Sequence, residues 1–462
     1  MIARAVALAF AAVVLGVGGA SAAPPTLTPM AAPAGCLSSI GHGFAGSPYT
    51  GYCTYNPLLK GVYAAAMSPD GKNLYVVSRY GNTLVGFARN PTTGALTQLP
   101  QPGGCFTKHG SDGCQVGRAL WEPVDVVVSP DGLNVYVASW RSGGVAVFLR
   151  DKVSGTLTQP DRTKGCITAT GSGGGCAKGR ALAGARALAV AGLPGLKSYV
   201  FVASETANGV AALTRNLYAG GGGDGSLSQA SGKYGCIEHR GNEGCADGRA
   251  LMGPNAITAD QSNVYMASGG TGGIAVFKIS GDSGLQQLAG TAGCVTADGS
   301  GGACAKGRAV EAPDAIAESP DHHTVYVSRG RPSASPPPDG GLAVFTRAAD
   351  GSLRQAPGAD GCLTPDGKEG CEKPSVYLAS MKFQALTVTA ETTYLGFYAG
   401  TRAADGSLLD ITQEPWDYMG DVRAIVTSPD RRNVYVVGNG FDPLTFLDPP
   451  ASDGIQIYRA GG

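Results

Sequence analysis

Residues 129–139 read Ser-Pro-Asp-Gly-Leu-Asn-Val-Tyr-Val-Ala-Ser, and the fold class follows from this stretch. Its Pro-Asp-Gly segment is typical of a tight turn, and the β-branched and aromatic residues after it favour a strand. Residues 125–128 before the turn, and residues 144–148 and 156–159 after it, are three further strand-like runs bounded by turn residues. The stretch therefore predicts four short antiparallel strands joined by tight turns.

The same unit recurs along the chain, with an aromatic residue at the centre of each second strand. The aromatic residues that we expect to be buried are Tyr75, Tyr136, Phe201, Tyr265, Tyr326 and Tyr435, and Tyr394 marks the approximate equivalent position in the sixth unit. The sixth unit departs from the pattern, and its middle strand is merged or shortened. Seven four-stranded sheets predict an all-β fold, a seven-bladed β-propeller formed as one domain by residues 23–462.

The two ends of this repeat complement each other. The last unit stops after its third strand, at residues 454–458. Residues 26–29, followed by Gly35-Cys36, match residues 156–159, followed by Gly165-Cys166. An exposed sheet edge is a site of aggregation unless it is paired or covered. We therefore expect the N-terminal strand to pair with the last blade and close the ring.

The composition and the N-terminus restrict the class of protein. Of 462 residues, 72 are Gly and 29 Pro, and 35 basic residues balance 35 acidic ones, which argues against nucleic-acid binding. Residues 1–22 have one positive charge, an apolar run and a small-x-small end, which predicts a signal peptide too short to span a membrane. No later run has membrane length. We expect a secreted, extracytoplasmic monomer without a membrane span.

Twelve cysteines follow the predicted signal peptide as six close pairs. An even number of cysteines in a secreted chain predicts disulfides, and the absence of a Cys-x-x-Cys spacing argues against zinc. The pairs are Cys36 with Cys53, Cys105 with Cys114, Cys166 with Cys176, Cys236 with Cys245, Cys294 with Cys304, and Cys362 with Cys371. The pairs lie in the loops that connect an outer strand to the next inner strand, so we expect disulfide-pinned loops on one face.

The repeated turn and the Asn-x-Tyr-Val-x-Ser strand, best preserved at residues 68–78 and 129–139, resemble the bacterial lactonase-like propellers. Those proteins are related to 6-phosphogluconolactonase and to the YVTN-type surface repeats. The resemblance covers nearly all of the mature chain and implies a lactonase-like hydrolase. The shared motifs form turns and strands, so they indicate the fold and not the reaction.

One position breaks the repetition at the start of each inner strand. It holds, in blade order, Tyr63, Val124, Arg186, Asn255, Asp314, Gln384 and Arg423. The next position is Ala in every blade except the second, where Asp125 stands. Inner strands line the central channel of a propeller, so these side chains are expected to converge at its mouth. The alternative is a hydrated polar opening without a ligand.

This ring contains the groups that lactone opening requires. Asp314 or Asp125 is the candidate base, and Arg186 and Arg423 are candidates for holding a carboxylate or an oxyanion. Asn255, Gln384 and Tyr63 are candidate substrate-binding residues, joined by Trp121 and Trp140 in loops suited to stacking on a sugar. We expect no cofactor, with Ca²⁺ at Asn255 and Asp314 as a minor alternative.

The ring departs from the resembling family in one type of residue. Lactonase-like propellers of this type often carry His after the Pro that opens an inner strand, where this chain has Val124, Asn255 and Asp314. Two functions therefore remain. The first is hydrolysis of a lactone or related sugar-derived ester at the channel mouth. The second is a non-catalytic extracellular propeller that binds a glycan, a cell-wall component or a protein.

A second repeated column contains Arg118, Arg180, Arg249 and Arg308, each between Gly and Ala. These arginines could form an anion-binding rim. Because the column repeats, we expect instead that they bind loop carbonyls or a neighbouring Asp and hold the loops in place.

Overall fold

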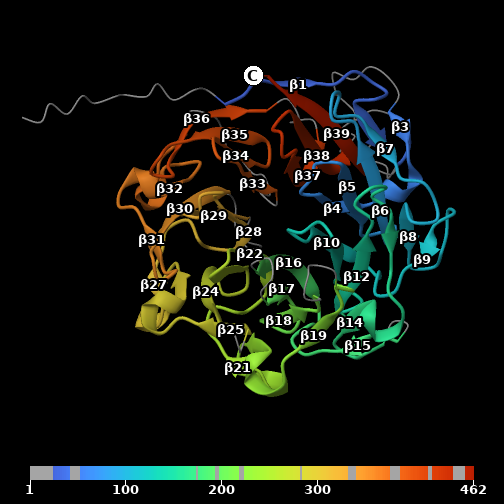
Figure 1. Cartoon of the computed structure of the whole chain (residues 1–462). Helices are drawn as coiled ribbons and strands as arrows, with labels where there is room; N and C mark the ends of the chain where they lie inside the picture. Colours follow the sequence, from blue (N-terminus) through green and yellow to red (C-terminus); the bar gives the residue numbers. More distant parts are fainter. Residues whose placement is uncertain are drawn as a thin grey trace, which may run out of the picture.

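Seven small sheets surround a central axis in the computed structural model, which confirms the predicted propeller (Figure 1). The structure describes residues 24–41, 53–172, 175–192, 197–217, 223–280, 284–330, 340–374, 385–414, 419–440 and 453–461. The predicted signal peptide and Gln384 lie outside these residues. None of the helices in the described ranges is long and apolar enough to cross a membrane.

Each blade is built from an inner, a second and a third antiparallel strand. The inner strands are β4 (Val62–Met67), β10 (Pro123–Val128), β16 (Ala185–Gly192), β22 (Pro254–Ala259), β28 (Pro313–Glu318), β33 (Leu386–Val388) and β37 (Met419–Thr427). The second strands are β5 (Asn73–Ser78), β11 (Asn134–Ser139), β17 (Ser198–Ser204), β23 (Asn263–Ser268), β29 (Thr324–Arg329), β34 (Thr392–Leu395) and β38 (Asn433–Gly440). The third strands are β6 (Thr83–Arg89), β12 (Gly144–Arg150), β18 (Gly209–Arg215), β24 (Gly273–Ser280), β30 (Gly341–Arg347), β35 (Tyr398–Arg402) and β39 (Asp453–Ala460).

The outer edge of most blades contains more than the single fourth strand that the sequence predicted. A first outer strand pairs with the end of the third strand: β7 (Leu96–Gln98), β13 (Leu157–Thr158), β19 (Leu227–Gln229), β25 (Gly284–Gln287), β31 (Leu353–Gln355) and β36 (Leu408–Gln413). A Cys-containing strand pairs with its beginning in blades one to five: β8 (Cys105–Thr107), β14 (Cys166–Thr168), β20 (Cys236–Glu238), β26 (Cys294–Thr296) and β32 (Cys362–Leu363); β2 (Cys36–Ser38) does the same in blade seven. A parallel edge strand follows in blades one to four: β9 (Gln115–Val116), β15 (Ala177–Lys178), β21 (Ala246–Asp247) and β27 (Ala305–Lys306); β3 (Thr54–Tyr55) is its counterpart in blade seven. Blade six has four separate strands, β33 to β36, so its middle strands are shortened, as one form of the prediction had it, and are not merged.

The helices in the described residues are all short 3-10 helices. They are η1 (Pro57–Leu59), η2 (Arg162–Lys164), η3 (Gly232–Tyr234), η4 (Asn242–Gly244), η5 (Gly290–Gly293), η6 (Ser300–Gly302), η7 (Ala359–Gly361) and η8 (Lys368–Gly370). Most of them lie in the loops around the cysteines.

All six predicted disulfides form, with the predicted pairing. They join Cys36 to Cys53, Cys105 to Cys114, Cys166 to Cys176, Cys236 to Cys245, Cys294 to Cys304, and Cys362 to Cys371. The first cysteine of each pair lies in an outer-edge strand that pairs with the third strand of its blade. Each bond therefore pins a loop directly to its sheet.

The second cysteine of each pair comes directly before the residue that starts the parallel edge. Cys53, Cys114, Cys176, Cys245 and Cys304 precede an edge strand, and Cys371 precedes Glu372, which forms an isolated parallel bridge with Leu363. All six of these cysteines are buried. The disulfides thus fix the parallel edge beside the Cys-containing strand, a detail that the spacing of the pairs could not predict.

The disulfide loops and the turns between second and third strands share one face, as predicted. The loop after Cys166 meets the turn between β11 and β12, because the Ala169 amide donates to the Gly143 carbonyl at 2.9 Å. The loop after Cys236 repeats this contact, since the His239 amide donates to the Asn208 carbonyl at 2.9 Å. The disulfides therefore stiffen the rim of the face on which the inner strands begin.

The N-terminal segment closes the ring, which confirms the prediction. β1 (Leu27–Pro29) and β2 (Cys36–Ser38) pair with β39, and β3 (Thr54–Tyr55) follows β2 as a parallel edge. Leu27 lies opposite Ala460 and Cys36 opposite Gln456. The first and last parts of the chain therefore build one blade, visible where blue meets red in Figure 1.

Arginine side chains clamp neighbouring blades together through the repeated turn motif. Arg150 of blade two donates to Asp70, to Asn73 and to the hydroxyl of Tyr75 in blade one. Equivalent arginines, Arg215, Arg347 and Arg89, bind the corresponding residues of blades two, four and seven. The aromatic residues of the second strands are buried, as predicted. The hydroxyls of four of the tyrosines among them accept hydrogen bonds from these arginines.

The second arginine column serves the loops. Arg180 donates to the carbonyls of Gly232, Gly244 and Ala230 at 2.6–3.2 Å, and Arg308 repeats this pattern in the loop of blade five. The prediction of a loop-holding role is thereby confirmed for these residues.

Candidate active site at the channel mouth

The ring residues sit at irregularities in the inner strands. The pairing register shifts between Val62/Ala64, Pro123/Asp125, Ala185/Ala187, Pro254/Ala256, Pro313/Ala315 and Val422/Ala424. In each case the skipped residue is the ring residue. A β-bulge leaves its extra residue outside the ladder and redirects the side chain, and bulges are enriched beside active sites.

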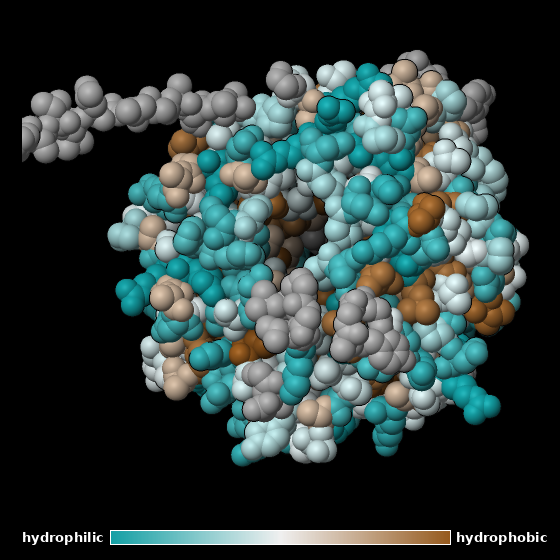
Figure 2. Space-filling model, viewed as in Figure 1, coloured by the Kyte–Doolittle hydropathy of each residue, from teal (hydrophilic) through white to brown (hydrophobic). Residues whose placement is uncertain are grey.

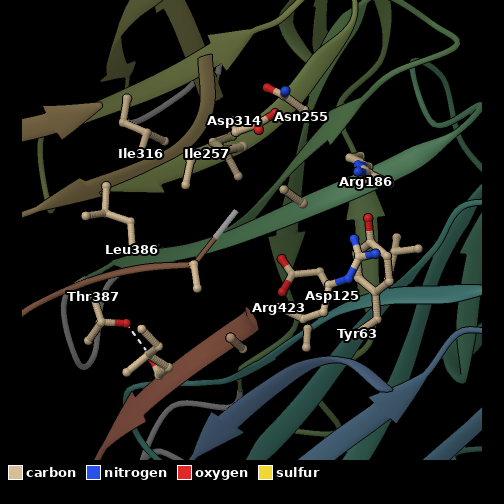
Figure 3. A pocket seen from close by; sticks show the side chains of 18 of the residues that line it. Tyr63, Asp125, Arg186, Asn255, Ile257, Asp314, Ile316, Leu386, Thr387 and Arg423 are labelled. Atoms are coloured by element: carbon tan, nitrogen blue, oxygen red, sulfur yellow. Dashed lines mark hydrogen bonds between the residues drawn. The ribbon is translucent and has the colours of Figure 1, made fainter. Parts of the chain in front are cut away.

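The redirected side chains line one cavity of about 270 Å³ at the centre of the propeller. Figure 2 shows the ring hollowed at its centre, and Figure 3 shows the lining residues. The lining includes six of the seven predicted ring positions and Asp125, and none of the disulfide cysteines. Further along the same strands come alanines and then Ile257, Ile316, Leu386 and Ile425. The cavity thus combines a polar ring with apolar walls, the usual make-up of a small-molecule site.

Tyr63 organises the cationic side of the ring. The guanidinium carbons of Arg423 and Arg186 lie 5.0 and 5.3 Å from the centre of its aromatic ring, and that of Arg79 lies 5.8 Å away. Cations at such distances from an aromatic face are attracted to it. The ring of Tyr63 therefore holds arginines from three different blades near one point.

The three arginines differ in their other partners. Arg423 pairs with Asp421 at 2.5 Å, and Arg79 pairs with Glu122 at 2.8 Å. For the Arg186 guanidinium, no hydrogen bond or ion pair is found among the described residues. A cation in a recessed polar cavity with its donors unused by neighbouring side chains is a suitable anchor for a carboxylate or an oxyanion.

Asn255 and Asp314 form the oxygen-rich side of the ring (Figure 3). The Asn255 amide donates to the Pro313 carbonyl at 2.6 Å, which ties blade four to blade five beside Asp314. The Asn255 Oδ1 atom is buried, and no hydrogen-bond partner occurs for it in the described part of the chain. A Cβ atom at Gly330 would clash with the Asp314 carboxylate, so Gly330 provides the space that this group occupies.

Asp125 is held differently. Its Oδ1 accepts from the Val126 amide at 2.8 Å, and its Oδ2 accepts from the Leu188 amide of blade three at 2.7 Å. Burial raises the pKa of Asp125 to about 7, although these amides and the charge of Arg186 oppose the increase. With both oxygens bound to backbone amides, Asp125 is better suited to positioning β16, and with it Arg186, than to activating water.

Trp121 and Trp140, predicted to join the ring in binding a sugar, lie outside this cavity in a groove on the neighbouring surface of blade two. Arg79 links the two regions, because its guanidinium carbon lies 5.7 Å from the ring centre of Trp140 and 5.8 Å from that of Tyr63. The column of ring positions could not reveal Arg79, which follows the second strand rather than opening an inner one.

The oxygen atoms of Asn255 and Asp314 fall short of a calcium site. Ca²⁺ takes six to eight oxygen ligands, and these two residues supply few of them beside three arginines. Another group, Asp260, Glu318 and His322, has ligand atoms within 4.8 Å of one another. Arg347 already pairs with Asp260 there at 2.8 Å, so a cation occupies that position.

Comparison with known proteins agrees with the fold. Residues 60–167 match the family model described as lactonase, 7-bladed beta-propeller. No curated protein matches the chain significantly. A provisionally assigned 6-phosphogluconolactonase from Bacteroides uniformis ATCC 8492 has a TM-score of 0.49 and 16% identity over 76% of this chain and 85% of its own. Another from Bacteroides fragilis NCTC 9343 has a TM-score of 0.47 and 14% identity over 76% and 84%.

A structure of U3-55K reaches a TM-score of 0.51 with 10% identity, over 87% of this chain and 95% of its own. At such identities the likeness concerns the fold alone. The match over residues 60–167 is the comparison that carries the resemblance to lactonase-type propellers.

Proposed function

We propose that this lactonase-like seven-bladed propeller binds and hydrolyses a lactone or a related sugar-derived ester at its channel mouth. The observation that carries this proposal is the convergence of the Arg186 guanidinium and the Asp314 carboxylate on one cavity of about 270 Å³. A positive group for a developing oxyanion and a carboxylate for a proton are the two requirements of lactone opening by water.

Asp314 takes a proton from a water molecule, whose oxygen then bonds to the lactone carbonyl carbon. The carbonyl electron pair moves onto oxygen, and Arg186, with Arg423, stabilises that negative charge. Collapse of the tetrahedral intermediate breaks the ring C–O bond, and the proton on Asp314 passes to the leaving alkoxide. The product is a hydroxy acid, whose ionisation releases the proton that a titration detects.

Secretion belongs to the same proposal. Residues 1–22 have the pattern of a signal peptide. Twelve cysteines form six disulfides, which persist mainly in oxidising compartments. Both features support an extracytoplasmic enzyme that acts as a single propeller domain.

The test is a pH-stat assay of the oxidised mature protein on a panel of lactones. Asp314→Asn and Arg186→Gln should each lower kcat at least about 100-fold, the usual scale for a general base or an oxyanion partner. Asp360→Asn, a change at an exposed carboxylate, should have no effect. The melting temperatures of all variants should match that of the wild type.

If the wild-type protein releases no more acid than Asp314→Asn on any lactone, the hydrolase proposal fails. The second candidate function, a non-catalytic binding propeller, then remains, and the groove beside Trp121 favours it. A chelator such as EDTA, added to the same assay, tests the calcium alternative, and activity independent of the chelator agrees with the metal-free mechanism.

A further inference from the structure

A groove of about 680 Å³ lies on blade two, on the face that carries the disulfide loops. Its walls come from the segments before β10 and β16, the turn between β11 and β12, and the loops pinned by Cys105 with Cys114 and by Cys166 with Cys176. Trp121 and Trp140 contribute the aromatic surface. The groove is distinct from the channel cavity, and Arg79 is the link between the two in the described residues.

Trp121 is presented to solvent from a rigid base. The residue is 41% exposed, which is unusual for a large hydrophobic residue in this protein. Its backbone is fixed, because its amide donates to Ser142 Oγ at 3.0 Å and its carbonyl accepts from the Ser142 amide at 3.2 Å. A fixed, exposed indole loses little conformational entropy when a ligand packs against it.

Two cations gather around this indole. Lys108 Nζ lies 3.8 Å from the ring centre of Trp121, and the guanidinium carbon of Arg141 lies 4.9 Å from it. The groove lining contains Lys108, Arg118 and Arg141 but no carboxylate among the described residues. Within the same residues, neither Lys108 nor Arg141 forms an ion pair. Two cations beside one indole with no carboxylate in the lining make this part of the groove electropositive, which favours an anionic ligand.

We propose that this groove binds an acidic oligosaccharide, with a uronate carboxylate bound by Lys108 and Arg141 and its sugar ring packed against the exposed part of Trp121. The apolar face of a pyranose matches an indole, and carboxylates match the two cations. A neutral glycan would leave the cations uncompensated. The chain's net charge of zero lacks the long-range positive field typical of nucleic-acid binding. The site goes beyond the proposed hydrolysis and does not depend on it.

Calorimetric titration of the full oxidised chain with hexagalacturonate tests this site. The matched neutral probe is the fully methyl-esterified hexamer, and single-stranded oligothymidylate is the alternative polyanion. The acid should bind at least about 10-fold more tightly than the ester, a difference that salt reduces. Trp121→Ala should weaken both sugars by a similar factor. Lys108→Gln with Arg141→Gln should weaken the acid and leave the ester unchanged.

The matched control is Tyr234→Ala. Tyr234 is also exposed beside a cation, Lys233, but lies outside the groove, so its loss should change nothing. Equal binding of acid and ester, unchanged binding in Trp121→Ala, tighter binding of oligothymidylate, or no binding of hexagalacturonate at millimolar concentration would each overturn the proposal. Asp314→Asn should retain binding, so failure of the hydrolase proposal remains distinguishable.

Discussion

Arg89 of blade one bonds to Asp430 of blade seven at 2.9 Å, so one ion pair joins the two ends of the propeller. The Arg89 side chain is 2% exposed and also donates to Asn433 and to the hydroxyl of Tyr435. Asp, Asn and Tyr are the distinctive residues of the repeated turn and strand. They recur because, in several blades, these three side chains bind an arginine of the neighbouring blade.

Loss of the Arg89 clamp should destabilise the ring. Arg89→Ala leaves buried Asn and Tyr groups and a partly exposed carboxylate without their partner, which should lower the free energy of unfolding by about 3 kcal/mol. Urea denaturation measures this change. Arg459→Ala, a change at an exposed arginine on the same closing blade, is the control. A loss below about 1 kcal/mol for Arg89→Ala would contradict the clamp's importance.

Deletion of residues 23–30 should remove the strand that covers β39. Leu27 and Met30 are 7% exposed, and the Met30 amide donates to the Ile457 carbonyl at 3.0 Å. The exposed edge of β39 should lower the melting temperature and promote self-association. Differential scanning fluorimetry and size-exclusion chromatography measure the two effects. Thr28→Ala, at an exposed position of β1, should behave like the wild type. An unchanged melting temperature after the deletion would disprove strand closure as a source of stability.

Stability should fall as pH rises from about 4.5 to about 7. Burial, with the nearby charge of Glu243, raises the pKa of Glu238 to about 7. The folded state therefore holds a proton that the unfolded chain has already released, and each rise in pH across this window favours unfolding. Glu414 and Asp125 have pKa values raised by burial to about the same value and act in the same direction.

Glu238→Gln isolates this effect. The variant should gain stability relative to the wild type as pH rises from 4.5 to 7, and the gain should be constant above pH 7. Urea denaturation at several pH values provides the measurement, with exposed Glu372→Gln as the control. A pH-independent difference between Glu238→Gln and wild type would refute the raised pKa.

Stability should also fall as the pH is lowered below about 4, because the pKa of Asp70 is lowered in the folded state. Desolvation opposes this change in pKa, but hydrogen bonds from Ser68 and Arg150 outweigh it.

Asp125→Ala should separate positioning from proton transfer. Alanine already occupies this position in the other blades, so the variant should fold. Its free energy of unfolding should fall by about 1 kcal/mol, because the Val126 and Leu188 amides would bond to channel water instead of to the carboxylate. Lactone turnover, where the wild type shows it, should fall by less than about 10-fold, against at least about 100-fold for Asp314→Asn. A larger loss of kcat in Asp125→Ala than in Asp314→Asn would transfer the role of base to Asp125.

The repeat made most of the architecture predictable. Turn residues and the aromatic column define strands locally, and the pairing of the ends follows from the need to cover a sheet edge. The elaborate outer edge was not predictable, because Leu96–Gln98 and Cys105–Thr107 pair with one strand only after an intervening loop folds back. The arginine clamps were not predictable for a related reason, because Arg150 and Asp70 belong to different blades and meet only across the boundary between them.

The candidate site was predictable only in part. Counting back from the turns identified the residues at the channel mouth, and the structure places six of the seven positions around one cavity; Gln384 lies outside the described residues. The bulges that redirect these side chains leave no clear local signal. The arrangement of arginines around Tyr63 likewise depends on where blades one, three and seven face the axis.

Short-range patterns repeated along one chain were enough to specify the number of blades, the disulfide pairs, the closing strand and the positions that reach the channel. Other distinctions appeared only in the folded ring: Asp125 binds backbone amides while Arg186 faces the cavity, and Trp121 with its two cations forms a separate groove. Those distinctions depend on distances between residues of different blades, which come into contact only when the ring closes.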